Sequence, residues 1–312
     1  MICDGSAIRS ARLCWGETEV RRSPLNAYKL MDAPITVALN AMTLISILML
    51  VGLGLAVIFG LMGIINLSHG EFVTIGAFSV AIIQGFGGSF WLALLVAPLV
   101  GASVGFLIER SLIRFLYSRP LATILATWGL SLIIQQSLQL AFGAAPQRID
   151  SPITASVDLF GANYPLYRIV MIALASAIIV ASYLLIKRTR FGLDLRTVIQ
   201  NRDMAECLGI DTGRVYMIAF SLGAALAAIA GALIAPLTAV IAQMGVNYLA
   251  RSFFVVIVGG AGSVPGVVAG SAVVGGAETL LNYAIPATIA QALVLVLAVI
   301  IVRLKPDGLV RG

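Results

Sequence analysis

Residues 33–71 read APITVALNAMTLISILMLVGLGLAVIFGLMGIINLSHGE. No charged side chain interrupts the 38 residues from Ala33 to Gly70, whereas about 20 apolar residues already cross a bilayer. A polar cluster containing the only histidine of the chain, His69, closes this run, and a further apolar stretch follows it. Interrupted membrane helices of this kind are typical of transporters, in which the break lines a substrate path. The segment therefore predicts a polytopic membrane protein and favours a carrier.

The composition extends this prediction to the whole chain. Hydrophobic residues make up 60% of the 312 residues and charged residues only 11%, against about 25% charged in soluble domains. We predict an all-α membrane domain over residues 33–303, with about eight to ten transmembrane helices and broken segments near 66–71 and 259–266. The net charge of +6 indicates basic cytoplasmic loops rather than nucleic-acid binding. The three cysteines lack CxxC spacing and there is one histidine, so we expect no metal site.

The two ends of the chain differ from the apolar part. Residues 1–32 mix basic and acidic side chains and lack the apolar core of a signal peptide. Two interpretations stay open for them: a disordered tail on the cytoplasmic side, or a mis-assigned start, with translation beginning at Met31. The second is preferred. Residues 304–312 are predicted to form a cytoplasmic tail.

The charges of the loops predict their sides of the membrane. Basic residues concentrate in 110–119, 187–214 and 303–311, whereas 144–164 holds one arginine against two aspartates. The first three segments are therefore placed in the cytoplasm and 144–164 outside. The chain between Arg214 and Arg303 begins and ends in the cytoplasm, so it must cross the membrane an even number of times. This requires 249–284 to cross twice, although its first leg, 249–260, spans only about 18 Å as a helix. The side on which the first helix begins stays open.

A second break is predicted at residues 259–266, GGAGSVPG. Four glycines and a proline do not sustain a helix, and the freed backbone groups must face protein or water. Each half of the chain thus contains one broken segment, which suggests two related repeats around a central pathway. The residues predicted to line the path or its gate are Asn66, Ser68, His69, Glu71, Gly259, Gly260, Gly262, Ser263 and Glu278.

Structural explanations compete with this functional one. Ser68 and Glu71 have the spacing of a capping box, in which each side chain binds the backbone N–H of the other residue. Glu278 either reaches the external interface or faces the bundle, paired with a polar partner such as Asn282. For Arg251, simple snorkelling to the interface is preferred.

The loop 187–214 predicts an amphipathic helix from Leu195 to Leu208, with Asp194 as N-cap and Gly209 as the C′ residue. Such a helix lies on lipid headgroups or docks into a groove of a cytoplasmic partner. The chain contains no GxxxxGK[ST] motif. If transport is driven by ATP, hydrolysis must therefore take place in another subunit.

Five segments together resemble a known family. They are Phe59–Glu71 (FGLMGIINLSHGE), Arg119–Ser131 with RPLAT and LATWGLS, Met204–Ile210 (MAECLGI), Gly259–Gly266, and Lys305–Leu309 (KPDGL). In order and spacing, from about residue 34 to 310, they resemble the permease subunits of ABC importers for branched-chain amino acids and for urea or amides.

The resemblance implies a complex in the bacterial inner membrane. It implies a second, usually non-identical permease, two cytoplasmic ATPases that bind the ATP, and a periplasmic binding protein, so the chain itself needs no cofactor. The loop around 196–210 would be the coupling helix, with contacts to the ATPase through Arg196, Asn201, Arg202, Ala205, Glu206, Leu208 and Gly209. Residues 114–128 with Gln135, Gln136 and Gln200–Arg202 look closer to the urea/amide branch, and Gly262–Gly266 with Glu278 to the amino-acid branch. Both substrate classes stay open.

Two other classes share some of these features. An ion-coupled secondary transporter or channel would also have broken helices, but would usually show several intramembrane carboxylates, and here Glu71 and Glu278 are available. An intramembrane hydrolase would need a nucleophile and a base, and the neighbouring Ser68 and His69 do not give triad geometry. We therefore expect no catalytic residue in this chain.

Overall fold

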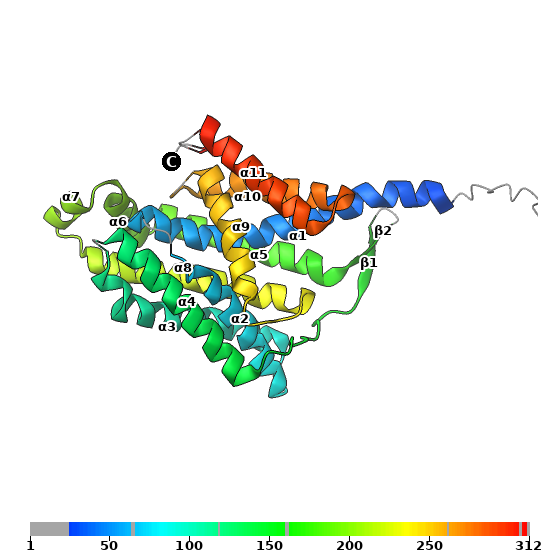
Figure 1. Ribbon diagram of the computed structural model, residues 1–312, viewed down its shortest axis with the longest axis horizontal. Helices are drawn as coiled ribbons and strands as arrows, with labels where there is room; N and C mark the ends of the chain where they lie inside the picture. The colour runs from blue at the N-terminus through cyan, green and yellow to red at the C-terminus, as the bar shows by residue number, and fades with distance from the viewer. Residues whose placement is uncertain are drawn as a thin grey trace, which may run out of the picture.

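The computed structural model describes residues 25–63, 66–117, 119–159, 162–260, 262–305 and 308–310. Within these residues the fold is built almost entirely from helices (Figure 1). The α-helices are α1 Leu25–Met62, α2 His69–Gly85, α3 Phe90–Ser111, α4 Pro120–Phe142, α5 Leu166–Arg188, α6 Arg190–Gln200, α7 Arg202–Cys207, α8 Thr212–Ile234, α9 Met244–Gly259, α10 Val264–Ala284 and α11 Ala287–Leu304. Short 3-10 turns, η1 Ile113–Phe115 and η2 Ala235–Leu237, extend α3 and α8. A small antiparallel hairpin of β1 Ser156–Leu159 and β2 Ala162–Pro165 precedes α5.

Seven of the described helices are long and apolar enough to cross a membrane: α1 from Pro34 on, α3, α4, α5, α8, α10 and α11. The helices α2 and α9 have 17 and 16 residues and reach about 25 Å, less than the roughly 30 Å of a hydrocarbon core. The prediction of an all-α polytopic protein is confirmed. The two short helices are those that adjoin the predicted breaks.

The direction of α1 follows from its contacts at either end. Near its start, the Thr43 hydroxyl lies 3.1 Å from the hydroxyl of Tyr164 in β2. Near its end, Val57 and Leu61 pack in one cluster with Leu195 of α6. If the hairpin is external and α6 cytoplasmic, as the loop charges predict, α1 would run from the external to the cytoplasmic side. Residues 1–24, on which the interpretations of the N-terminal segment depend, lie outside the described residues.

The centre of the bundle is α8, which packs against α1, α2 and α3. Small residues allow these helices to approach until their backbones touch. A methyl group placed on Gly231 of α8 would lie 1.9 Å from the Val73 carbonyl oxygen of α2, and one on Gly76 would lie 2.0 Å from that of Ala228. Close backbone approach through small residues is a main source of helix association in membranes.

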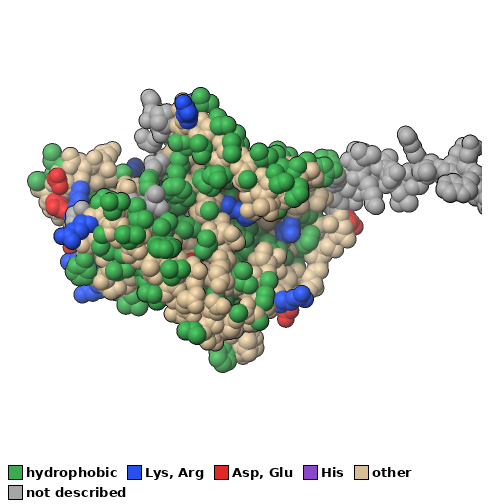
Figure 2. All heavy atoms as spheres, in the orientation of Figure 1, with side chains coloured by type: hydrophobic (Ala, Val, Ile, Leu, Met, Phe, Trp, Pro, Cys, Tyr) green, Lys and Arg blue, Asp and Glu red, His purple; other side chains and the backbone are tan. Residues whose placement is uncertain are grey.

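The outer surface suits a lipid environment. Large apolar side chains are exposed along α3, α4 and α11, among them Leu95, Leu99, Leu125, Ile133, Leu140, Val296 and Val299. Figure 2 shows hydrophobic and uncharged groups over most of the visible face. Charged side chains are most concentrated at the end of the molecule that carries α6 and α7, and a few others lie at the top, near the centre and at the opposite end. This distribution agrees with a bundle that crosses a bilayer and projects α6 and α7 into water.

Candidate translocation and coupling site

The first break is organised by Asn66. Its Oδ1 accepts hydrogen bonds from the Ser68 backbone N–H at 3.0 Å and from the Ser68 hydroxyl at 2.7 Å. Ser68 precedes α2, but its side chain makes no capping hydrogen bond. The predicted capping box is therefore wrong. The Ser68 hydroxyl donates to Asn66, two residues earlier, in an Asx-type turn. The Glu71 carboxylate binds side chains of α4 instead.

His69 begins α2 deep within the protein. It is fully buried, and its Nε2 lies 3.2 Å from the carbonyl oxygen of Val51, about three turns before the end of α1. The chain thus returns into the bundle after α1 and starts α2 at membrane depth. Among the described residues, His69 Nδ1 and Asn66 Nδ2 are the buried side-chain nitrogens without a hydrogen-bond partner. Such atoms usually find a partner, so this break can still bind a polar group.

Glu71 lies at the centre of a buried hydrogen-bond network. Its Oε1 accepts from the Ser131 hydroxyl and from Gln135 Nε2 of α4, both at 2.7 Å, and its Oε2 accepts from the Thr74 hydroxyl at 3.3 Å. The Thr74 hydroxyl in turn accepts from the Gly245 backbone N–H at 3.0 Å. One carboxylate therefore connects α2 with α4 and, through Thr74, with α9.

The helix α4 is held by a polar stripe. The buried residues of α4 are Thr123, Thr127, Ser131 and Gln135, which recur every four residues and so share one face. Beyond the contacts to Glu71, the Thr127 hydroxyl accepts a hydrogen bond from the Leu67 backbone N–H at 3.2 Å. The sequence analysis did not assign this stripe, although its spacing of four was a visible signal.

The second break joins α9 to α10. Gly260 and Gly262 have positive φ values of 107° and 80°, a region that glycine alone adopts readily. Ser263 caps α10 by accepting from the Gly266 N–H at 3.1 Å. The carbonyl oxygens of Val258 and Gly259 accept from the N–H groups of residues 309 and 310 at 2.9 and 3.2 Å. Freed backbone groups here thus bind protein, as predicted; Ala261 lies outside the described residues.

The second break packs against the end of α1. A methyl group on Gly60 would lie 2.9 Å from Gly262 Cα and 3.7 Å from the Ile199 side chain of α6. Glu278 does not join this contact: it lies in a separate cavity with Arg251.

The segment 187–214 forms two short helices, α6 and α7, rather than one. Asn201 interrupts the predicted helix, because its side chain accepts from the Met204 N–H at 3.0 Å and caps α7. Asp194 lies inside α6, whose N-cap is Thr189, so the prediction of Asp194 as N-cap is wrong. Gly209 is confirmed as the C′ residue: its φ is 82°, and the Ile210 N–H binds the Ala205 carbonyl oxygen at 3.0 Å, as in a Schellman motif.

The outer face of α6 and α7 combines charge with exposed apolar groups. Arg202 and Glu206 form an ion pair at 3.1 Å, and the Thr212 hydroxyl donates to Glu206 at 2.7 Å. These hydrogen bonds, that from Thr212 first, hold the pKa of the Glu206 carboxyl below its usual range. Met204 and Leu208 are 57% and 69% exposed. Exposed apolar side chains within a fixed charge pattern favour a protein partner.

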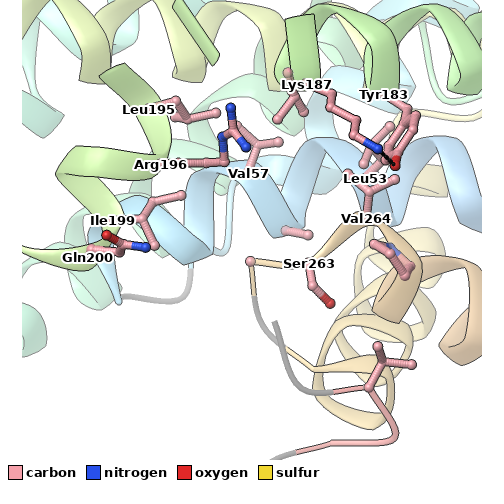
Figure 3. Close-up of a pocket in the computed structure, with 15 residues that line it drawn as sticks. Leu53, Val57, Tyr183, Lys187, Leu195, Arg196, Ile199, Gln200, Ser263 and Val264 are labelled. Carbon is pink, nitrogen blue, oxygen red and sulfur yellow. Dashed lines mark hydrogen bonds between the residues drawn. The ribbon is translucent and has the colours of Figure 1, made fainter. Parts of the chain in front are cut away.

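A cavity of about 570 Å³ lies between α1, α5, α6 and the start of α10. In Figure 3, Arg196, Ile199 and Gln200 of α6 face it from one side, and Ser263 and Val264 from the second break. Lys187 stands at its rim, 3.1 Å from the Tyr183 hydroxyl. The predicted coupling segment and the predicted gating segment therefore share one cavity.

Arg251 and Glu278 form an ion pair within the bundle. Arg251 Nη2 lies 3.0 Å from Glu278 Oε1, and the two side chains are 22% and 3% exposed. The expectation that Arg251 snorkels to the interface is wrong, because its guanidinium group binds the Glu278 carboxylate of the neighbouring helix α10. The predicted partner Asn282 is replaced by Arg251. The bundle-facing interpretation of Glu278 is confirmed, with Arg251 as its partner.

Membrane-length helices, two breaks beside short helices and a projecting helix pair define a multi-pass membrane protein of the transport-permease class. Comparison with known proteins agrees. The family described as "Branched-chain amino acid transport system / permease component" matches residues 37–304. The chain belongs to this family.

Individual relatives support this assignment. The branched-chain amino acid permease protein LivH of Salmonella typhimurium is 28% identical over 289 residues, covering 86% of this chain and 93% of that protein. BraD of Pseudomonas aeruginosa is 27% identical, covering 77% and 83%. LivM of Salmonella typhimurium is 26% identical, covering 76% and 61%. The structure of PsaBC from Streptococcus pneumoniae in complex with Fab superposes with a TM-score of 0.50 over 91% of this chain and 97% of that one; at 14% identity it shows the fold alone.

Proposed function

We propose that this chain is the membrane-embedded permease of an ATP-driven importer for branched-chain and other hydrophobic amino acids. The observation that carries the proposal is the family match over 37–304 together with α6 and α7, which provide a cytoplasmic docking surface. Urea and short amides form the second candidate substrate class, favoured by the resemblance of residues 114–128.

The partners follow from the same proposal. Two different permeases of Salmonella typhimurium, LivH and LivM, are both relatives of this chain, which favours a pair of homologous but non-identical permeases. Two cytoplasmic ATPases would bind α6 and α7 and hydrolyse the ATP, and a periplasmic binding protein would deliver the substrate. Lipid surrounds the bundle, and we expect no nucleic acid and no cofactor bound by this chain.

The contacts of α6 suggest how ATP hydrolysis reaches the path. Leu195 and Val198 of α6 are buried against the end of α1, and Ile199 lies beside Gly60, where the second break packs against α1. Movement of α6 by an ATPase would therefore displace the end of α1 and the Gly259–Gly266 break together. Because packed interfaces switch between discrete arrangements, a small shift here would change access to the path.

The test begins with the complex isolated from native membranes in mild detergent, with mass spectrometry of the proteins that accompany this chain. Recovery of ATPases and a second permease supports the proposal. The accompanying binding protein is then titrated with leucine, urea and acetamide. Recovery of this chain alone, stable and without any ATPase, would favour a secondary carrier or channel and contradict the proposal.

Gly209→Val is predicted to uncouple the ATPase while leaving the permease inserted. A left-handed residue with a side chain is disfavoured by about 1–2 kcal/mol, so the end of α7 would rearrange. We expect substrate-stimulated ATPase activity in proteoliposomes to fall about tenfold. Arg202→Glu, which places an extra acid beside Glu206, should act in the same direction.

Gly213→Val is the matched control for the coupling variant. Gly213 lies four residues further on, in the first turn of α8. It has no positive φ, and a methyl group there meets the Asp211 side chain at an ordinary 3.4 Å. Unchanged stimulation in both Gly209→Val and Arg202→Glu would refute the assignment of α7 as a coupling helix.

A further inference from the structure

A second cavity, of about 310 Å³, lies between α9, α10 and α11. Its polar lining consists of Asn247, Arg251, Glu278, Thr288 and Gln291, drawn from all three helices. Phe254, Val274 and Leu295 contribute apolar walls. The volume lies at the small end of the roughly 300–1,000 Å³ that small-molecule pockets occupy, and a few polar groups among apolar walls are typical of such pockets.

The cavity lies toward the external side of the bundle. The α10–α11 connection, residues 284–287, is opposite the basic tail and therefore external. Glu278 lies within two turns of the end of α10, and Thr288 and Gln291 lie in the first two turns of α11. A solute released on the external face would reach this cavity before the second break, which lies at the other end of α10.

Arg251 and Glu278 balance each other's charge, and their ion pair uses only part of the hydrogen-bonding capacity of Arg251. A guanidinium group has five N–H donors in a fork that can bind a carboxylate through two parallel hydrogen bonds. Arg251 contacts Glu278 through Nη2 and lies over the Tyr248 ring at 5.8 Å. A buried ion pair is often no more stabilising than well-packed apolar side chains. Stability alone therefore does not explain this pair, and intramembrane charges usually mark a substrate pathway.

We propose that this cavity binds the zwitterionic head group of a branched-chain α-amino acid, with the carboxylate on Arg251 and the ammonium group on Glu278. The inference rests on the proposed function and assigns a substrate site within it. A bound zwitterion would lie antiparallel to the ion pair, so that the four charges alternate and the net charge of the cavity stays zero. Asn247 and Thr288 supply further hydrogen-bonding groups, Gln291 hydrogen-bonds the Glu278 side chain, and the apolar walls suit an aliphatic side chain.

The test measures binding of tritiated leucine to the purified complex in nanodiscs, without the binding protein and without nucleotide. Leucinamide lacks the carboxylate and 4-methylpentanoate lacks the ammonium group, so each competes only through one half of the site. We expect saturable leucine binding, with both competitors at least about tenfold weaker than unlabelled leucine. The double variant Arg251→Met/Glu278→Met preserves side-chain volume and is expected to weaken leucine binding at least about tenfold.

Arg214→Met breaks an exposed ion pair of 2.9 Å with Asp211, while leaving the Asp211 cap of α8 in place, and serves as the control for loss of an ion pair. If the Arg251 and Glu278 double variant does not fold, Glu278→Gln is measured instead. It should keep the fold and specifically lose the preference for leucine over 4-methylpentanoate. A folded double variant that binds leucine like the wild type, or Glu278→Gln with an unchanged preference, overturns the site.

The substrate site and the proposed transport function can be contradicted separately. Wild-type complex that transports leucine with its binding protein, but shows no saturable leucine binding in nanodiscs, overturns this site and leaves the proposed function intact. Wild-type complex that transports no branched-chain amino acid overturns the proposed function itself.

Discussion

Glu71→Leu is expected to detach α4 from the bundle and abolish transport. The substitution removes the shared acceptor of Ser131, Gln135 and Thr74. Gln135 keeps its hydrogen bond to the Ser131 hydroxyl, but the buried Ser131 and Thr74 hydroxyls lose their acceptor. A buried group left unpaired costs about 1–3 kcal/mol. The fully buried residues of α4 are all polar, whereas its apolar contacts with the core come from residues that are only partly buried. We expect a destabilisation of roughly 3 kcal/mol or more, measured as a lower melting temperature and a smaller folded fraction on size-exclusion chromatography.

Two variants test whether the loss of stability comes from the hydrogen bonds between Glu71 and α4 or from any substitution in these helices. Glu71→Gln retains an acceptor oxygen at the same position and should lose much less stability than the leucine variant. Ser137→Leu places a leucine on the exposed side of the same helix α4, where Ser137 binds only the Ile133 carbonyl oxygen, and should be near neutral. Wild-type stability in Glu71→Leu would mean that α4 is held by other contacts.

The helices themselves were largely predictable from the sequence. Each apolar run, bounded by glycines, prolines or charged loops, became one helix, because backbone groups in lipid must be satisfied within the segment. The short helices were predictable for the same reason, since the glycine-rich segment 259–266 and the polar cluster at Asn66 cannot extend a helix. The direction of α1 required the contacts of its two ends with Tyr164 and Leu195.

The errors share one physical origin, which is competition among polar partners. Ser68 and Glu71 fit a capping box locally, but Asn66 reaches Ser68 over two residues, and α4 offers Glu71 stronger donors from 60 positions away. Asn201 similarly ends one helix and caps the next, which amphipathic periodicity did not predict. The pairing of Arg251 with Glu278 depends on the packing of α9 on α10. Long-range partners of this kind are not visible in spacing along one chain.

Gly231→Ala is expected to prevent normal packing of α2 on α8. The new methyl group would lie 1.9 Å from the Val73 carbonyl oxygen, well inside van der Waals contact. The obstructing atom belongs to the backbone, so no rotamer change relieves the contact and the helices must separate. Overpacking typically costs 1–3 kcal/mol, and we expect about 3 kcal/mol here. The measurement is the folded yield in membranes together with the melting temperature of the purified protein.

A contrasting site tests this explanation. At Gly105 the nearest obstruction is a side chain, the Ala224 methyl group, at 2.6 Å. Gly105→Ala should therefore be rescued by Ala224→Gly, whereas Gly231→Ala should not be rescued by Val73→Ala, because the carbonyl oxygen remains. Gly129→Ala, where no atom lies within 4 Å, should be neutral or slightly stabilising. Rescue of Gly231→Ala by Val73→Ala would show that side chains, and not the two backbones, set the distance between α2 and α8.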